Sequence, residues 1–176
     1  MLDAPVSGGE AGAEAGTLSI MVGGERAVYE RCLPLFHAMG KNVIYMGANG
    51  NGQKTKMVNQ VVGALNLLAT VEGIRLAAAA GLNVDDALKA VGGGAAGSWM
   101  LSNIGPRIAR ADFAPGFTIR LQDKDMRLAL ELFHDLGMDS PGTELTASLF
   151  RKAVERGLGE IGNHGIYRLW ETASGS

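Results

Sequence analysis

A lysine and two amides follow a glycine-rich segment in the stretch from 47 to 60, GANGNGQKTKMVNQ. If this stretch enters a helix, Lys56, Asn59 and Gln60 stand at positions i, i+3 and i+4, so one ammonium group and one or two amides share a face. Such a set suits the binding of a substrate oxygen or carboxylate. Taken alone, however, the three residues are better explained as a solvated first-turn lysine with capping amides.

A second candidate for binding an anion lies near the start of the chain. Ser7, Gly8 and Gly9 offer a hydroxyl group and successive unobstructed backbone N–H groups, a combination that can form a concavity for a carboxylate. An ordinary strand-to-helix turn has the same composition. For this motif by itself the turn is the preferred interpretation.

A third charged motif places Lys124 between Asp123 and Asp125 at the beginning of an amphipathic segment, 121–136. The sequence alone favours a solvated, charged first helical turn here. Functions that need a metal or a nucleophile lack support. The three histidines are far apart without metal-ligand neighbours, so no metal site is predicted, and there is no GxSxG elbow or cysteine–histidine pair.

Composition limits the class of protein. The 176 residues are 47% apolar and 19% charged, which allows a sizeable core and argues against disorder. The net charge of −2, without a basic cluster, argues against nucleic acid as a partner. A single cysteine, Cys32, excludes a disulfide framework, and no signal peptide or membrane-spanning segment is recognised. We therefore expect a globular protein of the cytoplasm.

Hydrophobic patterns predict the elements that must position these residues. Two short apolar runs, 18–22 and 41–46, fit buried strands, and the helical spacing of 25–39 between them indicates a βα unit of a parallel sheet. From 52 to 80 the chain reads as one long helix with apolar residues on nearly every side, which predicts burial within protein.

Further helices are expected after the long one. Asn83 is a plausible N-cap for 84–91, and the later helices are predicted at 121–136, at 141–156 and, shorter, at 167–170. Trp99, which precedes the first of these later helices, is expected to pack in the core. The predicted fold is mainly α.

Four separate motifs resemble the β-hydroxyacid dehydrogenase family, which holds 3-hydroxyisobutyrate dehydrogenase and tartronate semialdehyde reductase (2-hydroxy-3-oxopropionate reductase). They are DAPVSGGEAGAEAGTL at 3–18, GxxGxGxxxK ending at Lys56, SWML with GPRIARADFAPGF within 98–117, and the lysine–aspartate pair at 124–125 followed by LA. The chain also departs from the family. Many members carry Asn where Gln60 stands, and the family commonly has an aspartate at Gly162 and a serine near His164.

The resemblance implies roles for the candidate residues. Ser7, Gly8 and Gly9 would bind the substrate carboxylate, with Asn59 or Gln60 as the amide that assists. Lys56 would be the general acid in reduction and the general base in oxidation, and Lys124 would contact the cofactor, NAD or NADP. The implied enzyme is an NAD(P)-dependent oxidoreductase that interconverts a short 3-hydroxy acid and its semialdehyde.

The resemblance also implies how the chain is divided. Residues 1–47 would be the last βαβ remnant of a Rossmann domain, and 48–176 an all-α substrate, catalytic and oligomerisation domain, like the C-terminal domain of 6-phosphogluconate dehydrogenase, built on the long central helix. The GxGxxG spacing in GGGAAG at 92–97 follows a helical pattern instead of a strand and is rejected as a dinucleotide fingerprint. The cofactor site is therefore expected to be incomplete, as in a C-terminal part of a family member.

Two classes of function remain open at this point. The chain is either the substrate and catalytic part of such a dehydrogenase or a non-enzymatic, α-helical oligomerisation module derived from one. A lyase or hydrolase that uses Lys56 without a nucleotide is a third class, for which no nucleophile is evident. In each of the first two classes the long helix is expected to form a homodimer or homotetramer, and neither involves a membrane.

Overall fold

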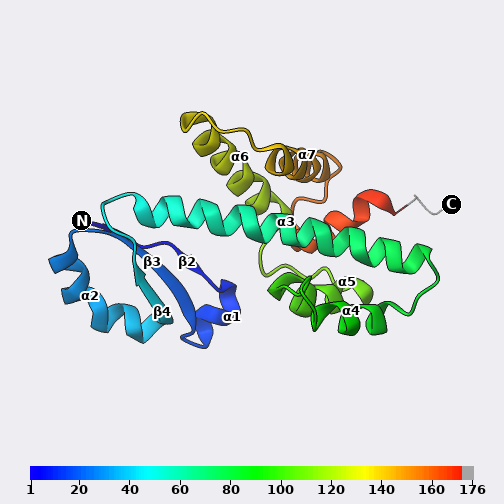
Figure 1. Ribbon diagram of the computed structural model, residues 1–176, viewed down its shortest axis with the longest axis horizontal. Coiled ribbons are helices and arrows are strands. Elements are labelled where there is room, and N and C mark those ends of the chain that lie inside the picture. Colours follow the sequence, from blue (N-terminus) through cyan, green and yellow to red (C-terminus); the bar gives the residue numbers. More distant parts are fainter. Residues whose placement is uncertain (172–176) are drawn as a thin grey trace. The chain divides into compact units, whose positions relative to one another are not determined.

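The computed structural model describes residues 1–171, and the chain divides into two compact units, Met1–Gln60 and Val61–Ser176. The elements of the first unit are shown in blue and cyan in Figure 1: β1 (Leu2–Asp3), β2 (Val6–Ser7), α1 (Gly9–Glu14), β3 (Leu18–Gly24), α2 (Arg26–Met39) and β4 (Gly40–Tyr45). The boundary between the units falls inside the long helix α3 (Asn51–Ala79), so the first turns of α3 belong to the first unit.

The sheet of the first unit is centred on β3. Strand β4 pairs with β3 in parallel, with Ile20 opposite Val43, and the antiparallel strands β1 and β2 pair with its other edge. The connection from β3 to β4 runs through α2, as the spacing of the apolar residues predicts. The expected strand–helix–strand unit is therefore confirmed.

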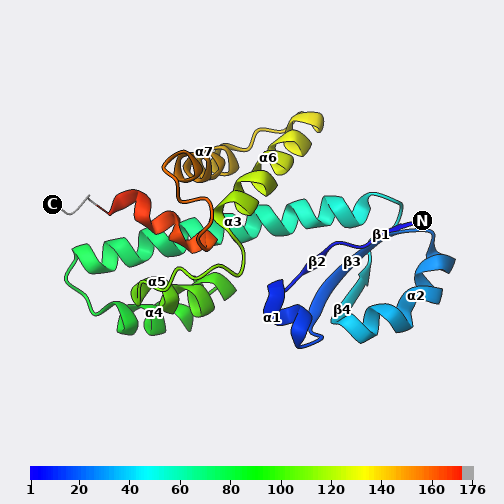
Figure 2. The same cartoon turned by 180° about the vertical axis from the view of Figure 1, so that it is seen from behind.

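The two faces of this sheet have different surroundings. Helix α2 covers one face of the sheet (Figures 1 and 2), and Ile20, Val22, Tyr29 and Phe36 belong to one buried core cluster. Side chains alternate along a strand, so Met21, between Ile20 and Val22, points to the opposite face. The first turns of α3 lie on that opposite face, which carries the site described below.

Helix α3 begins and ends within one residue of the predicted range. It contains no proline, and Gly81 after its end adopts a positive φ of 72°, a common way to stop a helix. Within the single chain the burial of α3 is incomplete, because Val58, Val62 and Leu76 are 61%, 53% and 71% exposed. Their spacing places them in one stripe along the helix, while Leu67 and Val71 on another face are buried.

By length and composition alone, α3 is also apolar enough to cross a membrane. Core helices pass the same test, and this one carries Lys54, Lys56, Glu72 and Arg75 along its length. Packing in the second unit explains the buried part of its apolar surface, which includes Leu67 and Val71. The absence of a membrane partner stays a prediction.

The second unit continues from α3 as a set of helices (Figure 2). They are α4 (Val84–Gly92), the π-helix η1 (Met100–Ile104), α5 (Gly105–Ala109), α6 (Ile119–Asp135), α7 (Pro141–Glu155) and the 3-10 helix η2 (Asn163–Trp170). The side chains of Leu67, Ile119, Met126, Phe150 and Ile166 form much of its core. The fold is mainly α with a small βαβ part at the start of the chain, as predicted.

Local details of this unit test the sequence interpretation. The side chain of Asn83 accepts a hydrogen bond from the backbone N–H of Asp86, so it caps α4 as expected. The GGGAAG segment follows the end of α4 and has no strand before it, which agrees with its rejection as a nucleotide fingerprint. Trp99 is exposed, so its expected place in the core is wrong.

Candidate active site

Lys56 reaches from α3 to the strand that contains Ser7. Its Nζ donates a hydrogen bond to the backbone carbonyl oxygen of Val6 at 2.8 Å, although fifty residues separate the two. The side chain is half-buried. The Lys56 ammonium group thus binds the residue that precedes Ser7 in the chain. The contact brings together Lys56 and Ser7, two of the site residues predicted from the sequence.

Asp3, four residues before Ser7, binds the beginning of α3. Its two carboxylate oxygens accept hydrogen bonds from the backbone N–H groups of Gly50, at 2.7 Å, and Gln53, at 2.9 Å. Desolvation of the carboxyl raises its pKa, but the backbone hydrogen bonds, those from Gly50 and Gln53 foremost, outweigh it, so the pKa of Asp3 lies below its usual value. A negative charge is also favourable at a helix N-terminus.

Two glycines allow α3 to approach the sheet this closely. A Cβ atom on Gly23 would lie 2.6 Å from Asp3 Oδ1 and 2.8 Å from the backbone nitrogen of Gly52. A Cβ atom on Gly52 would lie 2.7 Å from Asp3 Oδ2 and would overlap the carbonyl oxygen of Met21. Any side chain at either position would therefore force the helix away from β3.

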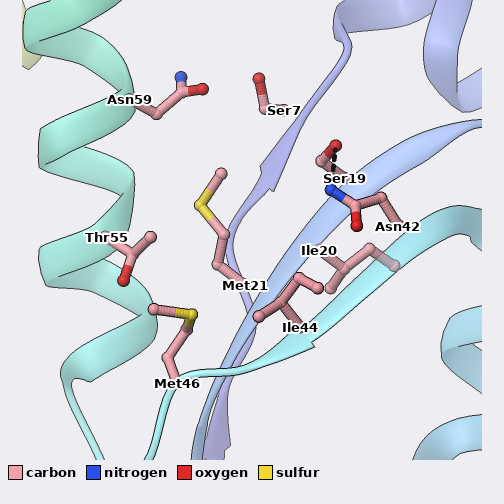
Figure 3. A pocket seen from close by; sticks show the side chains of 9 residues that line it. All are labelled: Ser7, Ser19, Ile20, Met21, Asn42, Ile44, Met46, Thr55 and Asn59. Carbon is pink, nitrogen blue, oxygen red and sulfur yellow. Dashed lines mark hydrogen bonds between the residues drawn. The ribbon is translucent and has the colours of Figure 1, made fainter.

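A pocket of about 370 Å³ lies where α3 diverges from the sheet. Figure 3 shows Ser7 and Asn59 at one end of it, with Asn59 extending from α3 toward β2, and Met21 beneath them. At another side, Asn42 Nδ2 donates to Ser19 Oγ at 3.2 Å. The remaining lining residues are Ile20, Ile44, Met46 and Thr55. The pocket thus combines polar groups near Ser7 with a mostly apolar wall.

The two neighbouring amides have different positions. Asn59 lines the pocket, and its Nδ2 donates to Gln60 Oε1 at 2.7 Å. Gln60 is buried. Asn59 is thus the amide that a molecule in the pocket would meet, and Gln60 holds it in place.

The glycine turn after Ser7 has the backbone conformation that its sequence indicates. Gly8 and Gly9 have positive φ angles of 138° and 62°, which L side chains rarely adopt, and both are exposed. Helix α1 begins at Gly9. The turn therefore presents accessible backbone next to the Ser7 hydroxyl.

Lys124 belongs to the second unit, on α6. Its Nζ forms an ion pair of 2.7 Å with Asp125 Oδ1, and the lysine side chain is 52% exposed whereas the aspartate is buried. The two residues form the lysine–aspartate motif at 124–125. The ammonium group is held in place and remains accessible.

A second polar cluster lies in the second unit, around His164. The His164 ring is 1% exposed, and its Nε2 lies 2.7 Å from the carbonyl oxygen of Asp112. Arg107 contacts both oxygens of Asp112, at 2.9 and 3.2 Å, and this side-chain hydrogen bond is the main reason why the pKa of Asp112 falls to about 2. Burial lowers the pKa of His164.

In the part of the chain that the structure describes, no group of three His, Cys, Asp or Glu residues could hold a metal ion. The structure thus brings together Ser7, Lys56 and Asn59 in the first unit. Sequence reasoning missed Asp3 and the polar pair of Ser19 and Asn42. Two polar residues within short apolar strands are a weak signal for that pair, whereas nothing local links Asp3 to Gly50.

Comparisons with known protein families divide the chain at nearly the same place as the sequence does. A model described as the NAD-binding domain of NADP-dependent 3-hydroxyisobutyrate dehydrogenase matches residues 50–170. A model described as the NAD binding domain of 6-phosphogluconate dehydrogenase matches residues 1–47. Both descriptions agree with NAD or NADP as the predicted cofactor.

Individual relatives support the same assignment. The chain is 46% identical over 96% of its length to an uncharacterized oxidoreductase, YkwC, of Bacillus subtilis, and 42% identical over 97% to 2-hydroxy-3-oxopropionate reductase of Escherichia coli. It spans 59% and 58% of the length of these two proteins. A crystal structure of 3-hydroxyisobutyrate dehydrogenase from Salmonella typhimurium superposes with a TM-score of 0.89 at 28% identity, covering 97% of this chain and 60% of that one.

Proposed function

Because the chain belongs to the β-hydroxyacid dehydrogenase family, we propose that its first unit binds a short 3-hydroxy acid or the corresponding semialdehyde for NAD(P)-dependent oxidoreduction. The observation that carries the proposal is the contact between Lys56 Nζ and the Val6 carbonyl oxygen, beside Ser7 at the end of a pocket that Asn59 also lines. The reductase of Escherichia coli, by its name, acts on a substrate of this class.

The proposed chemistry assigns one task to each group. The Ser7 hydroxyl and the backbone N–H groups of Gly8 and Gly9 bind the carboxylate, since a hydroxyl and accessible amides are suitable donors for an anion. The Asn59 amide donates to a substrate oxygen, while Gln60 fixes its orientation. Lys56, in its protonated form, donates a proton to the aldehyde oxygen during reduction and takes it back during oxidation.

The nicotinamide cofactor would supply the hydride for the carbonyl carbon when bound. Lys124 is the residue proposed to contact it, because its ammonium group is accessible and is fixed by a buried aspartate. In residues 1–171 the glycine runs with dinucleotide spacing, at 92–97 and 157–162, come at the ends of the helices α4 and α7, so neither forms a strand-to-helix phosphate turn. The described residues therefore fit only the part of the cofactor next to Lys124.

The test is turnover by the chain, alone and with the nucleotide-binding domain of a family member supplied. With that domain present we expect saturable oxidation of NADPH or NADH that requires 2-hydroxy-3-oxopropionate or the semialdehyde of 3-hydroxyisobutyrate. Nucleotide binding is followed in parallel by the fluorescence of the reduced cofactor. If a chain shown by circular dichroism to be folded gives neither binding nor turnover, the enzymatic proposal is wrong and the oligomerisation module is the better interpretation.

The exposed stripe on α3 favours an additional role in self-association, as a homodimer or homotetramer. Val58, Val62 and Leu76 expose apolar surface along one face of one helix, which is the usual pattern of a helix that packs against a partner. A Val62→Glu variant should lower the molar mass measured by light scattering in solution. Leu145→Glu, which adds an acid at an equally exposed apolar position on α7, serves as the control. An unchanged mass in both variants would contradict this role for α3.

A further inference from the structure

The segment from Leu2 to Ser7, which holds the strands β1 and β2, contacts α3 at two successive turns. At the first turn the Asp3 carboxylate accepts from the N–H groups of Gly50 and Gln53, and at the second the Val6 carbonyl accepts from Lys56 Nζ. We propose that Asp3 is a positioning residue that fixes the start of α3, so that Lys56 is held beside Ser7 in the orientation needed for proton transfer. This inference rests on the proposed function of Lys56.

The lengths of the two segments explain why both contacts form together. Three residues of extended strand, from Asp3 to Val6, advance about 10 Å. Three residues of helix, from Gln53 to Lys56, advance only about 4.5 Å, and the four-carbon stem of the lysine covers the difference. An anchor at Asp3 therefore leaves the ammonium group of Lys56 within reach of the Val6 carbonyl oxygen.

The anchor is specific in geometry as well as in charge. Both oxygens of Asp3 are used, and each takes one of the N–H groups that have no partner within the helix. Gly23 and Gly52 leave room for the carboxylate between strand and helix, since a Cβ atom on either would lie within 2.7 Å of an Asp3 oxygen. A shorter or neutral side chain at position 3 would leave at least one of these N–H groups without its acceptor.

The predicted effect separates positioning from simple capping. Loss of a cap destabilises any helix, but loss of this one should also free Lys56 from Val6. Asn83 provides the matched control, because its side chain caps α4 through the N–H of Asp86 at 3.0 Å and lies outside the first unit. Asn83→Ala removes a cap of the same kind without touching the strand that contains Ser7.

The experiment compares the wild-type chain with Asp3→Ala, Asp3→Asn and Asn83→Ala. Each protein is treated briefly with an acetylating reagent, and the rate of modification of Lys56 relative to Lys54 is measured by peptide mass spectrometry. In Asp3→Ala we expect this ratio to rise at least threefold, because Lys56 loses its fixed contact. Asp3→Asn should give a smaller rise, since one amide oxygen can still accept one hydrogen bond, and Asn83→Ala should give none.

A second readout uses turnover of the semialdehyde with NADPH or NADH. For Asp3→Ala we expect kcat to fall at least tenfold with a change in KM of less than threefold, while Asn83→Ala keeps the wild-type kcat at a temperature where both are folded. If the wild-type chain shows no turnover, the proposed function fails by that result alone, and the acetylation ratio still tests the positioning.

The inference is wrong if Asp3→Ala and Asp3→Asn keep both the acetylation ratio and kcat within twofold of the wild type. If Asp3→Ala does not fold, Asp3→Asn decides by the same two measurements. It preserves side-chain volume and one of the two hydrogen bonds, so its fold is expected to survive.

Discussion

Two polar clusters in this chain use similar residues for different ends. The first, around Asp3 and Lys56, and the second, around Asp112 and His164, each join segments that are at least 47 residues apart in the sequence. In the second cluster the His164 ring is enclosed and the Asp112 carboxylate is occupied by Arg107 and by the N–H of Ala114. In the first, a half-buried ammonium group lies next to a residue that lines a pocket.

The difference teaches which feature makes a titratable residue a candidate for catalysis. The second cluster has the stronger shift in pKa, since the pKa of Asp112 falls to about 2, yet its groups bind each other. In the first cluster, the Lys56 ammonium group donates to the Val6 carbonyl oxygen, and the next residue, Ser7, carries an accessible hydroxyl group. A shifted pKa by itself reports an ion pair, whereas an accessible proton beside a pocket indicates a site.

The largest expected effect tests the first cluster directly. Lys56→Met should lower kcat by roughly 10²–10⁴-fold, the usual contribution of a general acid or base. Lys54→Met, two residues earlier on the same helix and exposed, should leave kcat nearly unchanged. Steady-state kinetics with the semialdehyde provide the measurement. A kcat for Lys56→Met within tenfold of the wild type would remove the catalytic distinction between the two clusters.

The close packing of α3 on β3 beside the first cluster should be sensitive to any added side-chain volume. Gly52→Ala should destabilise the protein by about 1–3 kcal/mol, the typical cost of overpacking, because the new methyl group would press on Asp3 and on the carbonyl oxygen of Met21. Gly73→Ala is the control on the same helix, where a Cβ atom meets nothing within 4 Å and alanine favours the helix. Urea unfolding measures both. Equal stabilities would mean that the close approach of α3 to β3 does not exist in solution.

The second cluster should influence stability through pH instead of catalysis. Burial lowers the pKa of His164, so below about pH 6.5 the unfolded chain takes up a proton that the folded chain does not, and the free energy of unfolding falls. A second loss of stability begins below about pH 3.8. In the folded chain the pKa of Asp112 is lowered to about 2, so the unfolded chain binds a proton at this carboxyl first as the pH falls.

This pH dependence can be assigned by substitution. His164→Gln should be less stable at neutral pH and should lose part of the decline in stability between pH 7 and pH 5. His134→Gln, which changes an exposed histidine of α6, should keep the wild-type slope. Denaturant unfolding at several pH values gives both slopes. If His164→Gln retains the full slope, the buried ring is not the group that titrates.

The smallest effect concerns the cofactor. Lys124→Ala should weaken the binding of NADPH or NADH by a few-fold, since an exposed charge contributes about 1 kcal/mol or less. Arg127→Ala on the same helix, where the arginine pairs with Glu131 at the surface, should leave nucleotide affinity unchanged. Fluorescence titration resolves the difference. Equal affinities in both variants would leave Lys124 without a role in cofactor binding.

Much of the fold could be predicted from local patterns. The strands, α2 and the length of α3 follow from apolar spacing and from the positions of glycine, and each is found within a few residues of its expected range. The exposed stripe on α3 could not be foreseen, because an apolar helix looks buried on all sides when its partners are unknown. Trp99 was misplaced for a related reason, since an aromatic residue in a motif is by default assigned to a core.

The site was only partly predictable. Lys56 and Asn59 share a helix face, so their proximity follows from spacing alone, and their place next to Ser7 rests on long-range hydrogen bonds that no local pattern encodes. The identity of residue 162 has a tertiary explanation as well. A Cβ atom on Gly162 would overlap the His164 ring, so the close packing of this ring favours glycine at position 162. The division at residue 47 and the roles of the site residues stay predictions.

The most direct test of the central claim is to trap the substrate on Lys56 without any nucleotide. The chain is incubated with 2-hydroxy-3-oxopropionate and cyanoborohydride, which reduces the imine formed between the aldehyde and a nearby lysine, and the modified lysines are identified by mass spectrometry. We predict saturable modification of Lys56, faster than that of Lys54 and slowed by glycerate, the corresponding hydroxy acid. Modification of Lys56 that is no faster than that of Lys54, and that glycerate does not slow, would contradict a substrate site in the first unit.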